Sequence, residues 1–114
     1  MTLRMMTLWC VLALSAGCAS SAVLGPGNLN PAELSAEERS VKVYHQGQQP
    51  DCAYEELGLV EATSGTAFEM GTFESSLAKL QRSAHARGAT AVLVLDHSKN
   101  QMADQASGMA IRCK

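Results

Sequence analysis

A short apolar run that leads to a cysteine divides this chain and limits what remains to fold. One basic residue, Arg4, precedes residues 5–14, a stretch of ten residues that carries no charge. Such a run is too short to span a bilayer, which takes about 20 residues, but it is typical of an export signal. Small residues then lead to Cys18. We therefore expect residues 1–17 to be a signal peptide that is removed, which leaves one small domain to fold.

The residues before Cys18 give a specific expectation for that cysteine. The segment 14–18 reads Leu-Ser-Ala-Gly-Cys, which resembles the lipobox of bacterial lipoproteins, although that family prefers leucine where Ser15 stands. The resemblance implies that the Cys18 thiol takes a diacylglycerol and that this lipid anchors the chain to a membrane. Because Ala19 rather than aspartate follows, it also implies an address at the periplasmic face of the outer membrane. The alternative is an ordinary secretory signal cut at another site, with Cys18 free or lost.

The remaining cysteines predict one disulfide. Cys10 lies in the signal and Cys18 is assigned to lipid, so Cys52 and Cys113 remain. An even remainder in an oxidising compartment favours a bridge. A metal pair or a free catalytic thiol is the alternative, but there is no Cys-x-x-Cys motif and no histidine lies close in sequence to either cysteine. Closing this loop should contribute about 4 kcal/mol in the chain-entropy model.

Residues 18–40 are expected to form a lipidated tether with a short helical turn. Residues 19–30 are mostly small or turn-forming and show no apolar periodicity, whereas Ser35 and Glu38 have the spacing of a capping box. A flexible tether of this length would reach roughly 25 Å, so we expect it to hold the domain off the lipid surface.

Residues 41–114 are expected to form a periplasmic domain that begins with two strands. Residues 41–45 alternate, with Val41, Val43 and His45 on one face. A turn at residues 47–51 precedes a second strand near residues 54–62. The alternation changes phase early in that strand, which predicts a bulge near Glu55 and Glu56.

An amphipathic helix is expected after a loop at residues 63–71. Thr72 can cap its start and Gly88 can take the left-handed conformation at its end, with Lys79, Arg82 and Arg87 toward the negative end of the helix dipole. Its apolar face consists of Phe73, Leu77, Leu80 and Ala84.

Two further strands complete the expected domain. Residues 90–96 form a continuous apolar run, which predicts a central strand covered on both faces. Residues 97–107 are polar and are expected to connect it to a last strand at residues 109–113. The order β-β-α-β-β predicts a small α+β domain with one helix packed on a short sheet and one disulfide.

Short motifs in the domain resemble those of known lipoproteins. Besides Cys52, they are Leu-Gly-Leu-Val at residues 57–60, the stretch 77–85, Gly-Ala-Thr-Ala-Val-Leu at 88–93 and Gly-Met-Ala-Ile-Arg-Cys at 108–113. The chain resembles the YjeI-like family of small outer-membrane lipoproteins and, more distantly, the RcsF stress-sensor lipoproteins. The likeness implies an envelope role such as stress sensing. This chain differs from the sensors because it has one cysteine pair in the domain rather than two, and because it lacks a long proline-rich basic tether.

The composition argues against several function classes. A net charge of −2 and an aromatic content of 4% do not favour nucleic-acid binding. Glu55 and Glu56 are adjacent, so on a strand they face opposite ways and cannot act as a catalytic pair. We identify no small-molecule substrate and expect no cofactor. The expected role is a non-enzymatic interaction or stress-sensing domain whose partners are the membrane, through lipid, and an envelope protein.

Two features leave alternatives open. His45, Asp96 and His97 stand at expected strand ends and could form a Zn²⁺ or Cu²⁺ site, which would make the chain a periplasmic metal-binding lipoprotein; otherwise they are exposed loop residues. Phe68 and Met70 give the loop at residues 63–71 an apolar character. They either cover the core or are offered to a partner.

Overall fold

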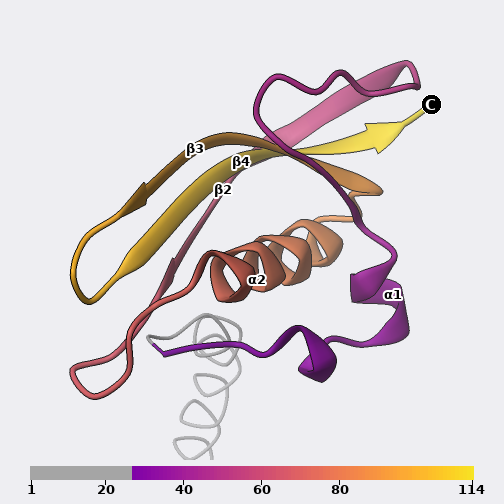
Figure 1. Cartoon of the computed structure of the whole chain (residues 1–114). Helices are drawn as coiled ribbons and strands as arrows, with labels where there is room; N and C mark the ends of the chain where they lie inside the picture. The colour runs from indigo at the N-terminus through magenta and orange to yellow at the C-terminus, as the bar shows by residue number, and fades with distance from the viewer. Residues whose placement is uncertain (1–26) are drawn as a thin grey trace, which may run out of the picture.

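A computed structural model describes residues 27–114, so the predicted signal, Cys18 and the first part of the predicted tether lie outside the described residues. The four strands form one sheet in the order β1-β3-β4-β2, and the long helix α2 lies across one face of it (Figure 1). The predicted α+β class and the β-β-α-β-β order are confirmed. In chain order the elements are η2 (Pro31–Glu33), α1 (Ala36–Arg39), β1 (Lys42–Tyr44), β2 (Tyr54–Ser64), α2 (Phe73–Ala86), β3 (Ala91–Lys99) and β4 (Asp104–Cys113).

The sheet mixes one parallel pair with two antiparallel pairs. β1 runs parallel to β3, whereas β4 is antiparallel to both β3 and β2. The β2–β4 register shifts between Glu56 and Gly58, one residue later than the predicted bulge. A second shift lies between Val94 and Asp96. The first bulge turns Leu57 toward the core beneath α2.

The helix α2 forms as its sequence predicts. The Thr72 hydroxyl accepts a hydrogen bond from the Ser75 N–H at the start, and Gly88 follows the end with a φ of 80°. Leu80 and Ala84 are buried, and Phe73 and Leu77 pack beside them. Among residues 27–114, no helix combines the length and the apolar character needed to cross a membrane.

The two faces of the sheet are covered unequally. The α2 side carries the main core, in which Val41, Val60, Val92 and Leu80 are each almost wholly buried. The opposite side, which we call the outer sheet face, carries a smaller cluster of Tyr44, Ala91 and Ile111 with Tyr54, Leu93 and Met109 against it. The chain between β1 and β2 crosses only part of this face (Figure 1). The prediction that residues 90–96 form a central strand is confirmed, and Ala91, Val92 and Val94 are buried. Cover on both faces does not extend to the end of the stretch, since Leu95 is 48% exposed.

The polar stretch at residues 97–107 is mostly strand rather than connection. β3 continues to Lys99 and β4 begins at Asp104, so only residues 100–103 form the turn. Ala106, Gly108 and Ala110 alternate on the face under α2, where a larger side chain would not fit; a Cβ at Gly108 would lie 2.7 Å from the Leu93 carbonyl oxygen. Because these core-facing residues are small, the sequence does not show the strong apolar alternation that usually identifies a strand. β2 likewise extends to Ser64, two residues further than predicted.

Residues 27–40, which we call the N-terminal arm, are packed against α2 rather than forming the predicted tether. Leu34 is 3% exposed, and the predicted capping box between Ser35 and Glu38 is present. The Ser35 N–H and Arg82 both bond the Glu38 carboxylate, which lowers the pKa of Glu38. Arg82 therefore joins the arm to α2. The arm forms a layer on the side of α2 that faces away from the sheet (Figure 1).

Candidate functional site

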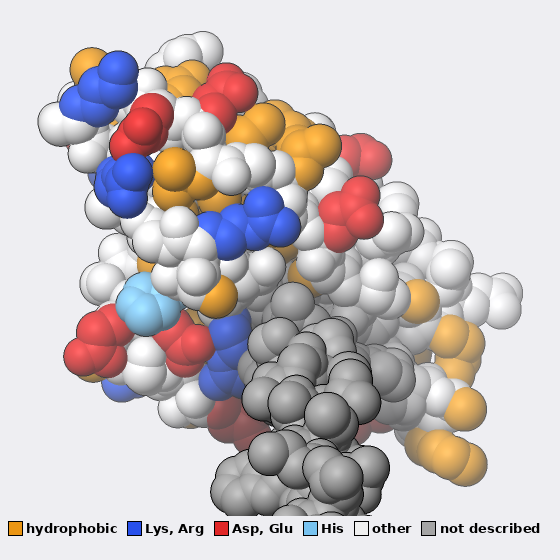
Figure 2. Space-filling view, turned by 180° about the vertical axis from the view of Figure 1, so that it is seen from behind, with side chains coloured by type: hydrophobic (Ala, Val, Ile, Leu, Met, Phe, Trp, Pro, Cys, Tyr) orange, Lys and Arg blue, Asp and Glu red, His pale blue; other side chains and the backbone are white. Residues whose placement is uncertain are grey.

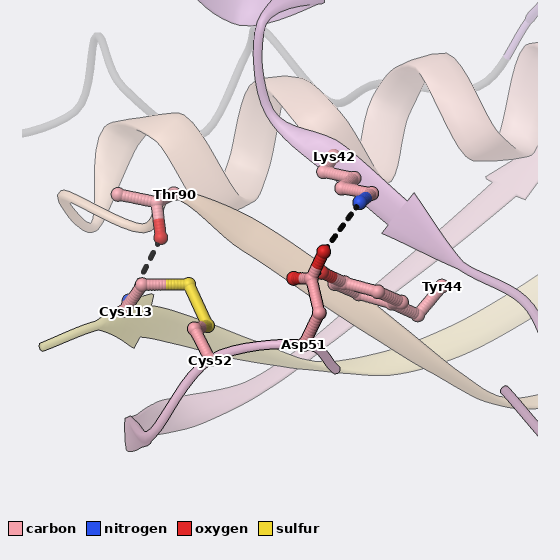
Figure 3. The surroundings of a disulfide bond; sticks show 6 residues. All are labelled: Lys42, Tyr44, Asp51, Cys52, Thr90 and Cys113. Atoms are coloured by element: carbon pink, nitrogen blue, oxygen red, sulfur yellow. Dashed lines mark hydrogen bonds and ion pairs between the residues drawn. A yellow bond between two sulfur atoms is a disulfide. The ribbon is translucent and has the colours of Figure 1, made fainter. Parts of the chain in front are cut away.

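The predicted disulfide is present and joins the start of β2 to the end of β4. Cys52 and Cys113 are bonded, with their Cα atoms 5.7 Å apart (Figure 3). The Cys113 N–H donates to the Thr90 hydroxyl, and the Lys114 N–H donates to the Ala53 carbonyl. The bridge thus lies in an ordered corner where the ends of two neighbouring strands meet.

Three side chains beside the bridge hold the chain between β1 and β2 against the outer sheet face. The Tyr44 hydroxyl donates to Asp51 at 2.9 Å, and the Lys42 ammonium lies 3.5 Å from the other Asp51 oxygen (Figure 3). These contacts, with Tyr44 first, lower the pKa of Asp51. Tyr44 is buried, whereas the ion pair between Lys42 and Asp51 is exposed and adds little stability by itself, so the group serves to order the segment.

The three candidate metal ligands do not form one group. Asp96 and His97 are consecutive in β3, so Asp96 lies toward the outer sheet face and His97 toward α2. The His97 and His45 rings approach the Phe73 ring, with centroids 4.0 and 6.1 Å away. Across residues 27–114, no set of three His, Cys, Asp or Glu side chains is arranged to hold a metal ion.

His97 instead belongs to a polar network under α2 that the sequence did not reveal. Its Nε2 atom lies 2.6 Å from the Asp104 carboxylate, which is fully buried. The other Asp104 oxygen accepts from the Ser76 hydroxyl at 2.7 Å, and Ser76 lies 3.0 Å from the Ser64 hydroxyl. Ser64 also bonds the Thr72 backbone. The network therefore links β2, α2, β3 and β4.

The network has the residue types of a hydrolase triad but not the connections. In a triad the histidine contacts the serine directly and removes its proton. Here Asp104 lies between His97 and Ser76, and neither Ser64 nor Ser76 is exposed to solvent. A substrate has no access to these hydroxyls, so the arrangement suits packing rather than nucleophilic catalysis.

One signal in the sequence could have identified the network. Ser76 lies three residues after Phe73 and four before Leu80, on the stripe that faces the core. A hydroxyl at a core position needs a hydrogen-bond partner, because an unpaired buried polar group is costly. The identity of that partner could not be read locally, since Asp104 is 28 residues further along the chain.

Lys79, which was predicted to lie toward the negative end of the helix dipole, is in the middle of α2 and is buried. It is 4% exposed, and its ammonium donates to the carbonyls of Gly27 and Thr63 at 2.6 and 2.7 Å. Burial lowers the pKa of Lys79. This side chain fastens the beginning of the N-terminal arm to β2.

The outer sheet face and one end of the molecule carry exposed apolar side chains. Leu59 on the outer face is 57% exposed, while Phe68 and Met70 in the loop after β2 are 99% and 53% exposed. The alternative in which these apolar side chains cover the core is therefore wrong.

Between the arm and the start of α2 lies a polar depression of about 330 Å³ whose lining includes Glu33, Glu69 and Glu74.

Comparisons with known proteins identify no relative of this chain. No protein-family model, curated protein or solved structure matches the chain.

Proposed function

We propose that this protein is an exported lipoprotein, anchored to the periplasmic face of the outer membrane by acyl chains on Cys18. The observation that carries the proposal is the disulfide between Cys52 and Cys113. Disulfides persist in oxidising compartments and are rare in the cytosol, so a bridge that ties two strand ends supports export. The signal-like residues before Cys18 supply the route.

We propose further that the domain acts by binding an envelope protein rather than by catalysis, as a stress sensor or adaptor would. The hydroxyls of Ser64 and Ser76 are buried, which removes them as nucleophiles. The outer sheet face, in contrast, offers Leu59, Leu95 and partly buried Met109 on a sheet stiffened by the bridge. Exposed apolar groups on an ordered surface are typical of protein interaction sites.

Anchoring is tested by two cysteine variants of the full chain. Cys18→Ser should carry no acyl groups and should retain residues 1–17, because the cut before Cys18 follows acylation of its thiol and the acyl chains provide the attachment. Cys10→Ser is the matched control: Cys10 lies in the apolar run that is removed, so the mature product should be acylated as in the wild type. Both properties are read from the intact mass of the membrane-extracted protein, and a wild-type chain without acyl groups, or a Cys18→Ser chain that still carries them, would refute the proposal.

Binding is tested by a photoreactive amino acid placed at Leu59 in intact cells. The control position is Glu37, which is exposed on α1 on the opposite side of the molecule. A discrete crosslinked protein at position 59 but not at 37 is expected. Equal crosslinking at both positions, or none at either, would count against the outer sheet face as the binding surface.

A further inference from the structure

Three exposed apolar side chains gather at one end of the molecule, and we call them the apolar tip. Phe68 and Met70 come from the loop between β2 and α2, and Met102 comes from the turn between β3 and β4. They are 99%, 53% and 45% exposed. Figure 2 shows hydrophobic side chains projecting at the corresponding end of the molecule, at the lower right. The two loops meet there although they are about 30 residues apart in the chain.

The tip is held in a defined shape by backbone contacts. The Gly71 N–H donates to the Met102 carbonyl at 3.0 Å, which joins the two loops. Gly65 packs so closely that an added Cβ would lie 2.3 Å from the same carbonyl oxygen. The Thr66 hydroxyl accepts from the N–H groups of Phe68 and Glu69, which shapes the turn. The apolar side chains are therefore presented by an ordered support, so little entropy is lost when they are buried.

The N-terminal arm begins at this same end. The Gly27 N–H donates to the Gly65 carbonyl, and the Asn28 amide donates to Glu69 and to the Met70 carbonyl. Gly27 is nine residues beyond Cys18. Even a fully extended chain of that length spans at most about 30 Å, whatever its conformation. A lipid on Cys18 therefore keeps Gly27, and with it this end of the domain, within that distance of the bilayer.

We infer that the apolar tip inserts into the lipid surface to which Cys18 is anchored and fixes the orientation of the domain on the membrane. This inference rests on the proposed lipidation of Cys18. Phenylalanine and methionine contribute apolar area that the acyl region of an interface accepts. The two loops contain no lysine or arginine and one carboxylate, Glu69. Insertion is thus expected in zwitterionic lipid, without a requirement for anionic headgroups.

The outer sheet face is then left clear of the inserted tip. Leu59 lies in the middle of β2 on the side opposite α2 and the arm, whereas the arm and the tip adjoin each other. One anchored orientation would leave that face accessible to an envelope protein.

Tryptophan fluorescence of the full lipidated chain tests the inference. The single natural tryptophan is Trp9, within the signal, so the mature chain contains none. Phe68→Trp, extracted from membranes and reconstituted in phosphatidylcholine vesicles, should shift its emission to shorter wavelength. It should also lose emission when lipids with a spin label near the headgroup are included. Leu59→Trp is the matched control, and its emission should stay unchanged.

Each outcome has a distinct meaning when intact mass is measured on the same preparation. Acylated protein in which Phe68→Trp is not quenched, or in which Leu59→Trp is quenched equally, overturns the inference and leaves the lipoprotein proposal standing. A shift seen in native membranes but not in protein-free vesicles also overturns it, in favour of a protein partner at the tip. Protein without acyl groups refutes the lipoprotein proposal, and the inference with it.

Discussion

The Ser76 hydroxyl is a single group on which three elements depend. It donates to the Asp104 carboxylate at 2.7 Å and lies 3.0 Å from Ser64, and all three side chains are fully buried. Ser76→Ala would leave a buried carboxylate oxygen without this donor. We expect the free energy of unfolding to fall by about 1–3 kcal/mol, measured by urea unfolding at neutral pH.

A serine elsewhere in α2 provides the control for this substitution. Alanine favours helix more than serine does, so Ser76→Ala gains a few tenths of a kcal/mol from propensity alone, roughly. Ser83 lies in the same helix, is only partly buried and takes no part in the network. Ser83→Ala should therefore be neutral or slightly stabilising. Equal effects of the two substitutions would show that the Ser76–Asp104 bond contributes nothing to stability.

Because of Lys79, the free energy of unfolding should change with pH in the alkaline range. Burial lowers the pKa of Lys79 below the value of 10.5 expected in the unfolded chain. Below the folded pKa the cost of burying the cation is present in full. Between the folded pKa and 10.5, the unfolded chain holds a proton that the folded protein has lost, so the free energy of unfolding rises with pH across this window.

This pH dependence can be isolated by comparison with Lys79→Met. The difference in unfolding free energy, wild type minus variant, should rise across the window and level off above it, because the other titrating groups cancel. Lys79→Met should also expose the arm to proteolysis, since the Gly27 and Thr63 carbonyls lose their donor. Lys99→Met, at an exposed position of β3, is the control and should show neither effect. A flat difference would mean that Lys79 keeps its ordinary pKa.

At the scale of elements, the N-terminal arm behaves as part of the domain. Leu34 is 3% exposed although it follows a helical turn of only three residues. Leu34→Ala should lower the free energy of unfolding by about 2 kcal/mol, at the low end of large-to-small substitutions because the arm can shift to fill the space. Glu37→Ala, exposed on α1, should change it by less than about 0.5 kcal/mol. A neutral Leu34→Ala, measured by the same urea unfolding, would show that the arm is an appendage.

The elements that could be predicted from the sequence are those whose signals are local. Thr72, Gly88 and the apolar spacing of α2 lie within one segment, and each acts as predicted. The two strands of the β3–β4 hairpin are longer than predicted, because the core-facing positions of the added part are filled by small residues and by Asp104, which lack the apolar pattern of a buried face. The parallel pairing of β1 with β3 has no local signal, because it depends on contacts about 50 residues apart.

The candidate sites follow the same rule. The disulfide was predictable because counting the cysteines requires no geometry. The packing of the arm has no local signal, because its partners, such as Lys79 and Arg82, lie in a helix far along the chain. The metal hypothesis placed Asp96 and His97 together, but their adjacency in a strand separates them onto two faces.

For the molecule as a whole, stability depends on how its two edge strands are protected. β1 forms one edge and has only three residues, so it presents little unpaired backbone. β2 forms the other edge over 11 residues and pairs only with β4, to which it is connected through α2 and β3. A long edge strand that pairs late along the chain is prone to fray and to associate with other chains. The disulfide fixes the end of this edge, where Tyr54 pairs with Cys113.

The double variant Cys52→Ser with Cys113→Ser tests this role of the bridge. Without the disulfide, the 61-residue loop between the two positions is no longer closed in the unfolded chain. The free energy of unfolding should therefore fall by about 4 kcal/mol. Hydrogen exchange should then accelerate first at the start of β2, next to the missing bond, while α2 stays protected until global unfolding. Wild-type protein treated with a reductant is the control and should unfold at the same urea concentration as the variant. If iodoacetamide labelled Cys52 and Cys113 in the wild type without reduction, the bridge would not exist in the cell and the argument for export would fail.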